Sequence, residues 1–162
     1  MSEAARILVI DDEENIRKTI SMTLQHAGYV VDTVENGRQA VQKSEVNFYN
    51  LALIDIRLPD MEGTELLTAL KDTTPRMVKI ILTGYPGLQN AVTAINRGVD
   101  AYLIKPVNPA ELLRVVKQHL DKQRQERAYD QEKVAEFVET RFKELETHEH
   151  DTSEPAKKSD FR

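Results

Sequence analysis

Five short apolar runs recur along the chain, and they constrain its fold more than any other feature. They are rich in Val, Ile and Leu and occupy residues 7–10, 29–31, 51–54, 78–82 and 101–104. Most are apolar at successive positions rather than at alternate positions. This pattern is typical of strands that are buried on both faces of a parallel sheet.

Helical patterns separate these runs. After the first run, Ile16, Ile20 and Leu24 recur at every fourth position, and Gly28 suits the end of that helix. Further helices are expected over residues 36–45, 63–70, 88–97 and onward from Asn108, which is a suitable N-cap. Strands and helices in strict alternation predict an α/β domain with a doubly wound, five-stranded parallel sheet.

The composition changes along the chain and suggests three parts. All six Gly and five of the six Pro lie at or before Pro109, whereas 15 of the 30 residues from 121 to 150 are charged. Residues 151–162 are polar and show no apolar periodicity. We therefore expect a folded domain over residues 1–122, a charged amphipathic helical extension over 123–150 and a disordered tail over 151–162.

The composition also excludes several classes of protein. The chain has no Cys, which excludes a disulfide framework and thiolate zinc sites. No apolar stretch approaches the roughly 18–20 residues of a membrane span. The first residues do not resemble a secretory signal, so we expect a cytoplasmic location. The formal net charge of −5 gives no general attraction to nucleic acid.

Polar side chains directly follow four of the five runs, namely Asp11 with Asp12, Asp55, Thr83 and Lys105. The carboxyl ends of parallel strands meet at one edge of a sheet, so these side chains are expected to converge. Clustered carboxylates need a compensating cation, and hard oxygen donors favour Mg²⁺. A metal ion and an ammonium group can neutralise a phosphoryl group while one carboxylate attacks phosphorus.

Taken singly, each of these residues has an ordinary structural explanation. A pair of Asp residues after a strand commonly caps a helix. Asp55 and Thr83 could belong to turns, and Lys105 could be a solvated lysine before a helix. Their occurrence together, each at the end of a predicted strand, favours a shared site.

Four segments that carry these residues resemble the receiver domains of two-component response regulators. The segments are Ile-Leu-Val-Ile-Asp-Asp-Glu (7–13), Leu-Ile-Asp-Ile-Arg-Leu-Pro-Asp-Met-Glu-Gly (53–63), Ile-Ile-Leu-Thr-Gly-Tyr (80–85) and Gly-Val-Asp-Ala-Tyr-Leu-Ile-Lys-Pro (98–106). The resemblance covers about residues 6–120 and implies a flavodoxin-like (βα)5 fold. The sequence of residues 83–88 is most similar to receivers of the nitrogen-regulation type. Those receivers usually precede an ATPase domain and a DNA-binding domain, for which this chain has too few residues.

The resemblance implies a role for each residue of the expected site. Asp55 would be the phosphoacceptor, and Asp11 and Asp12 would hold Mg²⁺ together with Asp55 and the backbone carbonyl of Arg57. The side chains of Thr83 and Lys105 would bind phosphoryl oxygens, and the peptide bond before Pro106 would be cis. Tyr102 would turn inward when Thr83 moves toward the phosphoryl group, although its position also suits an ordinary core aromatic.

The expected function is that of a signalling receiver. Such a protein takes a phosphoryl group from a histidine kinase or a phosphotransfer protein and controls an unknown partner. In an alternative, the C-terminal helix mediates dimerisation and an output to a transcription partner or DNA. An Asp-nucleophile phosphatase is disfavoured because Arg57 stands where such enzymes carry a second Asp. A flavin site is disfavoured because the Asp-Asp-Glu-Glu segment at 11–14 would repel phosphate.

The extension carries one apolar stripe, formed by Val134, Phe137, Val138, Phe142 and Leu145. Four of these residues fall within about 80° on a helical wheel, and Phe137 lies nearby. The stripe could fold back onto the receiver, or it could pair with a second copy or a partner. It is too short for a confident coiled-coil assignment. A metal site at His148 and His150 is disfavoured because only two imidazoles lie near each other.

Overall fold

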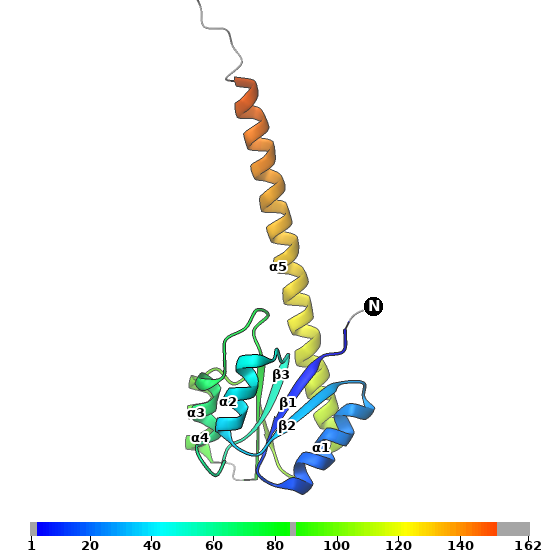
Figure 1. Ribbon diagram of the computed structural model, residues 1–162, viewed down its shortest axis with the longest axis vertical. Coiled ribbons are helices and arrows are strands. Elements are labelled where there is room, and N and C mark those ends of the chain that lie inside the picture. The colour runs from blue at the N-terminus through cyan, green and yellow to red at the C-terminus, as the bar shows by residue number, and fades with distance from the viewer. Residues whose placement is uncertain (1–2, 85–86, 152–162) are drawn as a thin grey trace, which may run out of the picture. The chain divides into compact units, whose positions relative to one another are not determined.

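The computed structural model of the protein describes residues 3–84 and 87–151 (Figure 1). The disordered tail predicted for residues 151–162 lies outside these residues, except for Asp151, which is helical. None of the helices in the described ranges is both long enough and apolar enough to cross a membrane.

Five parallel strands form a single sheet, as the apolar runs predict. The strands are β1 (Arg6–Ile10), β2 (Val30–Val34), β3 (Leu51–Asp55), β4 (Val78–Thr83) and β5 (Ala101–Ile104). They lie in the order β2-β1-β3-β4-β5. Ile10 pairs with Ile54, and Thr83 pairs with Ile104, so the carboxyl ends of β1, β3, β4 and β5 are level with one another.

The helices also occur where the sequence predicts them. They are α1 (Glu14–His26), α2 (Gly37–Val46), α3 (Gly63–Ala69), α4 (Leu88–Asn96) and α5 (Pro109–Asp151). Gly28 and Gly98 follow α1 and α4 with φ angles of 95° and 88°, a left-handed conformation that favours glycine. The Oδ1 atoms of Asn36 and Asn108 accept the backbone N–H groups of Gln39 and Ala110 and so cap α2 and α5.

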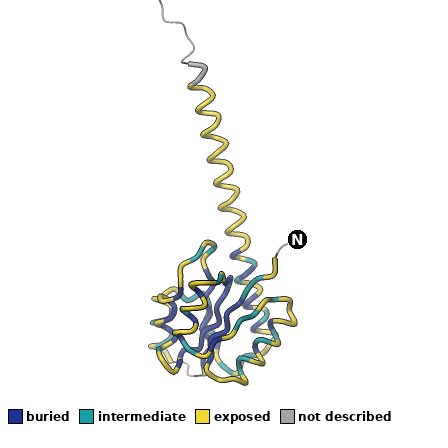
Figure 2. The backbone as a smooth tube through the Cα atoms, viewed as in Figure 1, coloured by how far each residue is buried: buried dark blue, intermediate teal, exposed yellow. Residues whose placement is uncertain are grey.

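Each strand contributes to two apolar layers, one on either face of the sheet. Leu8 and Ile10 pack toward α2, α3 and α4, whereas Ile7 and Val9 pack toward α1 and the first part of α5. Figure 1 shows this division of the helices between the two faces, and Figure 2 shows that the strands are the most buried part of the molecule. Burial on both faces explains the continuous apolar runs of β1, β3 and β4.

The second strand differs from its sequence prediction. The apolar run at 29–31 led us to expect a strand there, but β2 runs from Val30 to Val34. The backbone N–H of Tyr29 instead donates to Leu24 O at the end of α1. Because β2 is an edge strand, its burial is uneven: Val30 is exposed and Val34 is buried. The apolar run therefore marks the beginning of the strand but not its end.

The last helix of the receiver and the predicted extension form one helix, α5. Its first part packs on the sheet through Leu112, Val116 and Leu120. Gln123, which we assigned to the extension, is buried in the receiver, and the compact unit ends at Arg124. Every residue from Arg124 to His148 is exposed, including the apolar stripe, whose side chains are 47–65% exposed (Figure 2).

Candidate functional site

The polar residues at the strand ends do converge. Asp11 and Asp55 are buried, Thr83 is fully enclosed, and Asp12 is exposed at the surface of the same group. One oxygen each from Asp11, Asp12 and Asp55 can be chosen so that all three lie within 4.8 Å of one another. The register of the parallel strands produces this arrangement, because β1, β3 and β4 end at the same level.

Lys105 joins the two buried carboxylates. Its Nζ lies 2.7 Å from Asp11 Oδ2 and 3.4 Å from Asp55 Oδ2. Its backbone N–H donates to Thr83 O at 2.7 Å, which links the ends of β4 and β5. The peptide bond between Lys105 and Pro106 is cis. The Lys105 ammonium group therefore lies between the two carboxylates, at the carboxyl end of the sheet.

The buried setting changes the acidity of both partners. Burial, followed by the charge of Asp11, raises the pKa of the Asp55 carboxyl above its usual value, and Lys105 opposes this rise. Burial alone would lower the pKa of the Lys105 ammonium group. The hydrogen bond and charge of Asp11, together with the charge of Asp55, outweigh burial and raise that pKa. Lys105 therefore stays charged, while Asp55 is a carboxylate that benefits from further positive charge.

The loop after β3 turns sharply beside Asp55. A Cβ atom at Gly63 would collide with the backbone oxygen of Asp55, so only glycine fits this position without movement of the loop. The N–H of Gly63 donates to Ile56 O at 2.6 Å, and Arg57 forms an isolated antiparallel bridge with Glu62. The N–H of Arg57 donates to Asp55 Oδ1 at 3.4 Å. These contacts hold the Arg57 backbone next to the Asp55 carboxylate.

The residues of this group suit a magnesium ion. Asp11, Asp12 and Asp55 offer carboxylate oxygens, which are the hard donors that Mg²⁺ prefers. The exposed Asp12 leaves one side of the group open to water, and Mg²⁺ characteristically keeps several of its waters. Burial, followed by the charge of Asp11, raises the pKa of Asp55 although Lys105 opposes the rise, so a metal cation beside this carboxylate would favour its charged form.

Tyr102 lies on β5, and its ring packs against the apolar layer beneath α4. The residue is half-buried, and its hydroxyl oxygen is enclosed without a hydrogen-bond partner among the described residues. Its partial burial suits a core aromatic, and the switch role of Tyr102 stays a prediction.

Two contacts of the site were not predicted from the sequence. The Asp60 carboxylate accepts the N–H groups of Gly37 and Arg38, so it fastens the loop after β3 to the start of α2. The hydrogen bond from Gly37 is the main cause that lowers the pKa of Asp60. The Arg17 guanidinium donates to the backbone oxygen of Asp11 at 2.7 Å. Neither contact leaves a signal in the sequence, because the partners of Asp60 lie 23 and 22 positions away and Arg17 binds a backbone oxygen.

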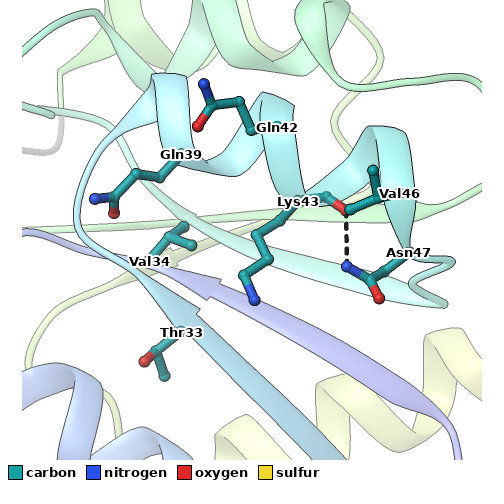
Figure 3. A pocket seen from close by; sticks show the side chains of 7 residues that line it. All are labelled: Thr33, Val34, Gln39, Gln42, Lys43, Val46 and Asn47. Atoms are coloured by element: carbon teal, nitrogen blue, oxygen red, sulfur yellow. Dashed lines mark hydrogen bonds between the residues drawn. The ribbon is translucent and has the colours of Figure 1, made fainter.

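One cavity among the described residues lies apart from the carboxylate group. This cavity of about 500 Å³ lies between β2 and α2 and is lined by the residues drawn in Figure 3: Thr33, Val34, Gln39, Gln42, Lys43, Val46 and Asn47. The dashed line in that view is the bond from the Asn47 side-chain amide to Lys43 O. None of these residues belongs to the carboxylate group, so the cavity is not part of the site.

Comparisons with known proteins agree with this geometry. Residues 7–117 match the family model described as response regulator receiver domain. The chain is 32% identical to Response regulator ArlR of Staphylococcus saprophyticus over 127 residues, which cover 77% of this chain and 56% of that protein. The chain thus spans about half the length of the curated relatives it matches.

Solved structures show the same relationship. A CheY-like receiver domain protein from Methanospirillum hungatei is 45% identical, with a TM-score of 0.74, covering 76% of this chain and 99% of that one. The response regulator TrrA from Thermotoga maritima, solved in complex with Mg(2+)-BeF, is 35% identical, with a TM-score of 0.64 and coverage of 71% and 98%. The fold, the matched family model and these relatives together establish that the chain belongs to the response regulator receiver domain family.

Proposed function

We propose that Asp55 accepts a phosphoryl group in a Mg²⁺-dependent reaction. The observation that carries this proposal is the position of the Asp55 carboxylate, which is buried, grouped with Asp11 and Asp12, and 3.4 Å from the Lys105 ammonium group. The pKa of Asp55 is raised, mainly by burial, and Asp55 ends a strand that is buried throughout.

In the reaction, an oxygen of Asp55 forms a bond to phosphorus while the bond from phosphorus to the donor atom breaks. The electron pair of that broken bond leaves with the donor. Bound Mg²⁺, held by the three carboxylates and the Arg57 carbonyl, would supply positive charge for the phosphoryl oxygens. Lys105 neutralises another oxygen, and the Thr83 hydroxyl donates a hydrogen bond. Attack by water on phosphorus later restores the carboxylate, which is a self-dephosphorylation.

The donor is a phosphorylated histidine on a kinase or a phosphotransfer protein. Its phosphoramidate bond breaks when the histidine nitrogen takes the electron pair and, from solvent, a proton. The product controls a downstream protein through the surface near Thr83 and Tyr102, since both residues lie on strands that end at the site.

Intact-mass measurement tests the proposal. Incubation with Mg²⁺ and a small phosphodonor such as phosphoramidate should add one phosphoryl group to the wild-type chain. Asp55→Asn should gain none, whereas the control Asp130→Asn, an exposed substitution in α5, should gain the same mass as wild type. Full phosphorylation of Asp55→Asn would refute the assignment.

We also propose that the apolar stripe of α5 pairs with the same stripe of a second copy. A highly charged helix of this length is only marginally stable in water, and five large apolar side chains on it are 47–65% exposed. Pairing through a two-fold axis would cover both stripes with one self-complementary surface. Each side chain that became fully buried would contribute on the order of 1.5–3 kcal/mol.

Light scattering during size-exclusion chromatography tests this second proposal. Val138→Glu, at the middle of the stripe, should convert a dimer into a monomer, whereas Thr140→Glu, outside the stripe, should leave the dimer intact. A wild-type chain that is monomeric at all concentrations, with and without a phosphoryl mimic, would exclude self-association and leave a different partner or the receiver itself to cover the stripe.

A further inference from the structure

Arg17 lies one turn into α1, and its side chain returns to the loop that precedes the helix. Side chains on an α-helix lean toward its N-terminus, so a long residue at this position can reach the turn between β1 and α1. The Arg17 side chain is only 12% exposed, although it belongs to a helix on the surface. Its NH1 atom donates to Asp11 O at 2.7 Å, and NH2 lies 3.4 Å from Glu35 Oε1.

The oxygen that Arg17 holds belongs to the peptide that joins Asp11 to Asp12. That peptide is planar, so fixing its carbonyl oxygen also fixes the direction in which the Asp12 chain continues. The rest of Asp11 is held as well: its N–H donates to Val34 O, Oδ1 accepts the N–H of Glu13, and Oδ2 accepts Lys105 Nζ. Asp12 is exposed, so its position depends on this backbone rather than on enclosure by neighbouring side chains.

We propose that Arg17 is a positioning residue for the metal site. It orients the peptide between Asp11 and Asp12 so that the Asp12 carboxylate faces the same point as Asp11 and Asp55. The inference rests on the proposed Mg²⁺-dependent function, because it concerns how tightly this chain binds that ion. Arg17 does not touch the metal or the phosphoryl group. Its loss weakens Mg²⁺ binding because the exposed carboxylate is no longer held in place.

The chain offers a matched control in the next residue. Lys18 carries the same charge on the same helix, but it is 68% exposed and pairs with Glu14 rather than with the loop. Arg17→Met and Lys18→Met therefore remove equal charge and keep an unbranched side chain, and only the first removes the hydrogen bond to Asp11 O. Arg17→Lys restores one donor and serves as the rescue variant.

Three measurements on the full chain test the proposal. A Mg²⁺ titration followed by NMR should give Arg17→Met a dissociation constant about tenfold above that of Lys18→Met, the lower end of typical effects for residues that orient metal ligands. Without metal, the Glu13 amide should exchange faster in Arg17→Met, while core amides such as that of Leu53 keep their protection. Phosphorylation of Arg17→Met should need more Mg²⁺ yet approach the wild-type rate at saturation, and Arg17→Lys should recover most of the affinity.

The possible failures are distinguishable. Equal Mg²⁺ affinity in Arg17→Met and Lys18→Met would overturn the positioning role. Absence of Mg²⁺ binding by the wild-type chain would instead overturn the proposed function. If Arg17→Met does not fold, Arg17→Gln replaces it, with Lys18→Gln as the control and the same tenfold difference expected.

Discussion

At the scale of single residues, the site is governed by how little water reaches the end of β3. All five residues of that strand, including Asp55, are buried, so the negative charge of the carboxylate has lost most of its solvation. Asp11 adds a like charge, and the charge of Lys105 and the hydrogen bond from the Arg57 N–H compensate in part. The Asp55 carboxylate, which we propose as the nucleophile, is therefore destabilised in its charged form until a metal cation binds beside it.

This setting predicts the pH response of Asp55. The pKa of Asp55 is raised in the folded state. As the pH falls, Asp55 therefore takes up a proton at a higher pH than an ordinary Asp, whose pKa is about 3.9. Because the folded state binds that proton more tightly than the unfolded state, ionisation of Asp55 lowers the stability of the fold as pH rises through this range. Carbon-13 NMR of the metal-free chain should show the raised midpoint.

Removal of Lys105 should raise the Asp55 midpoint further. In Lys105→Met the main opposing charge is absent, whereas Lys117→Met, an exposed substitution on α5, should leave the midpoint unchanged. An Asp55 midpoint that falls in Lys105→Met would show that Lys105 does not lower the pKa of Asp55.

Gly63 supports a second prediction at this scale. Ala at this position would place its Cβ against the backbone oxygen of Asp55, and a backbone atom cannot move aside as the tip of a side chain can. Gly63→Ala should lower the free energy of unfolding by about 2–3 kcal/mol, a typical cost of overpacking. Gly84→Ala is the control, because its Cβ would only reach ordinary contact with Lys105 at 4.0 Å and should cost less than about 0.5 kcal/mol. Equal losses in the free energy of unfolding of the two variants, measured by urea unfolding, would show that the loop after β3 can move to accept the added Cβ.

At the scale of elements, α5 is attached to the receiver by a buried amide. Gln123 Nε2 donates to Asn50 O at 3.0 Å and to Arg76 O at 2.7 Å, and its Oε1 accepts the Asn50 side-chain amide at 3.2 Å. Asn50 in turn precedes β3, and its Oδ1 accepts the N–H of Arg6 at the start of β1. One side chain on the helix thus joins the chain segments that enter β1, β3 and β4.

Gln123→Ala should therefore destabilise the receiver. The substitution removes the hydrogen bonds that Gln123 makes to Asn50 O, to Arg76 O and with the Asn50 side-chain amide, and we expect a cost of about 1–3 kcal/mol in the free energy of unfolding. Gln125→Ala makes the same change in helix propensity at an exposed position two residues later and should have little effect. Chemical denaturation of both variants checks the difference, and equal stability would mean that water replaces Gln123 at no cost.

The elements differ in how far the sequence could predict them. The buried strands and the capped helices were predicted correctly. Apolar periodicity and capping residues such as Gly28 and Asn108 determine the structure of the chain within a few positions of themselves. The predicted end of β2 was wrong because the second half of this edge strand does not continue the apolar run. Gln123 was assigned to the extension because its charged neighbours resemble a solvated helix, and its partners at Asn50 and Arg76 are far away in the sequence.

The same reasoning applies to the site. The strand ends located Asp11, Asp55 and Lys105 because parallel strands align their carboxyl ends, and the structure does bring these residues together. The hydrogen bond from Arg17 to Asp11 O could not be predicted, since every residue has a backbone oxygen and the sequence does not indicate which one is bound. The roles of these residues in phosphoryl transfer remain predictions from chemistry and family resemblance.

At the scale of the whole molecule, the unit that ends at Arg124 contains all five strands of the sheet. A chain truncated after Arg124 should therefore unfold at the same urea concentration as the full chain and accept phosphate equally well. Truncation after Lys122 should be less stable, because it removes Gln123. Circular dichroism with urea, together with intact-mass phosphorylation, measures both. A loss of folding after truncation at Arg124 would show that residues 125–162 stabilise the receiver.

The contact between Lys105 and Asp11 also has a consequence for the time at which the protein becomes active. The two residues are 94 positions apart, and Asp55 lies between them in the sequence. A ribosome therefore releases both acidic parts of the site long before it adds the ammonium group, and β5 cannot join the sheet until later still. A partly synthesised chain has no complete acceptor, so a kinase acting on nascent protein would find nothing to label. Under the proposed function, phosphorylation of Asp55 would therefore report that the last strand of the sheet is in place.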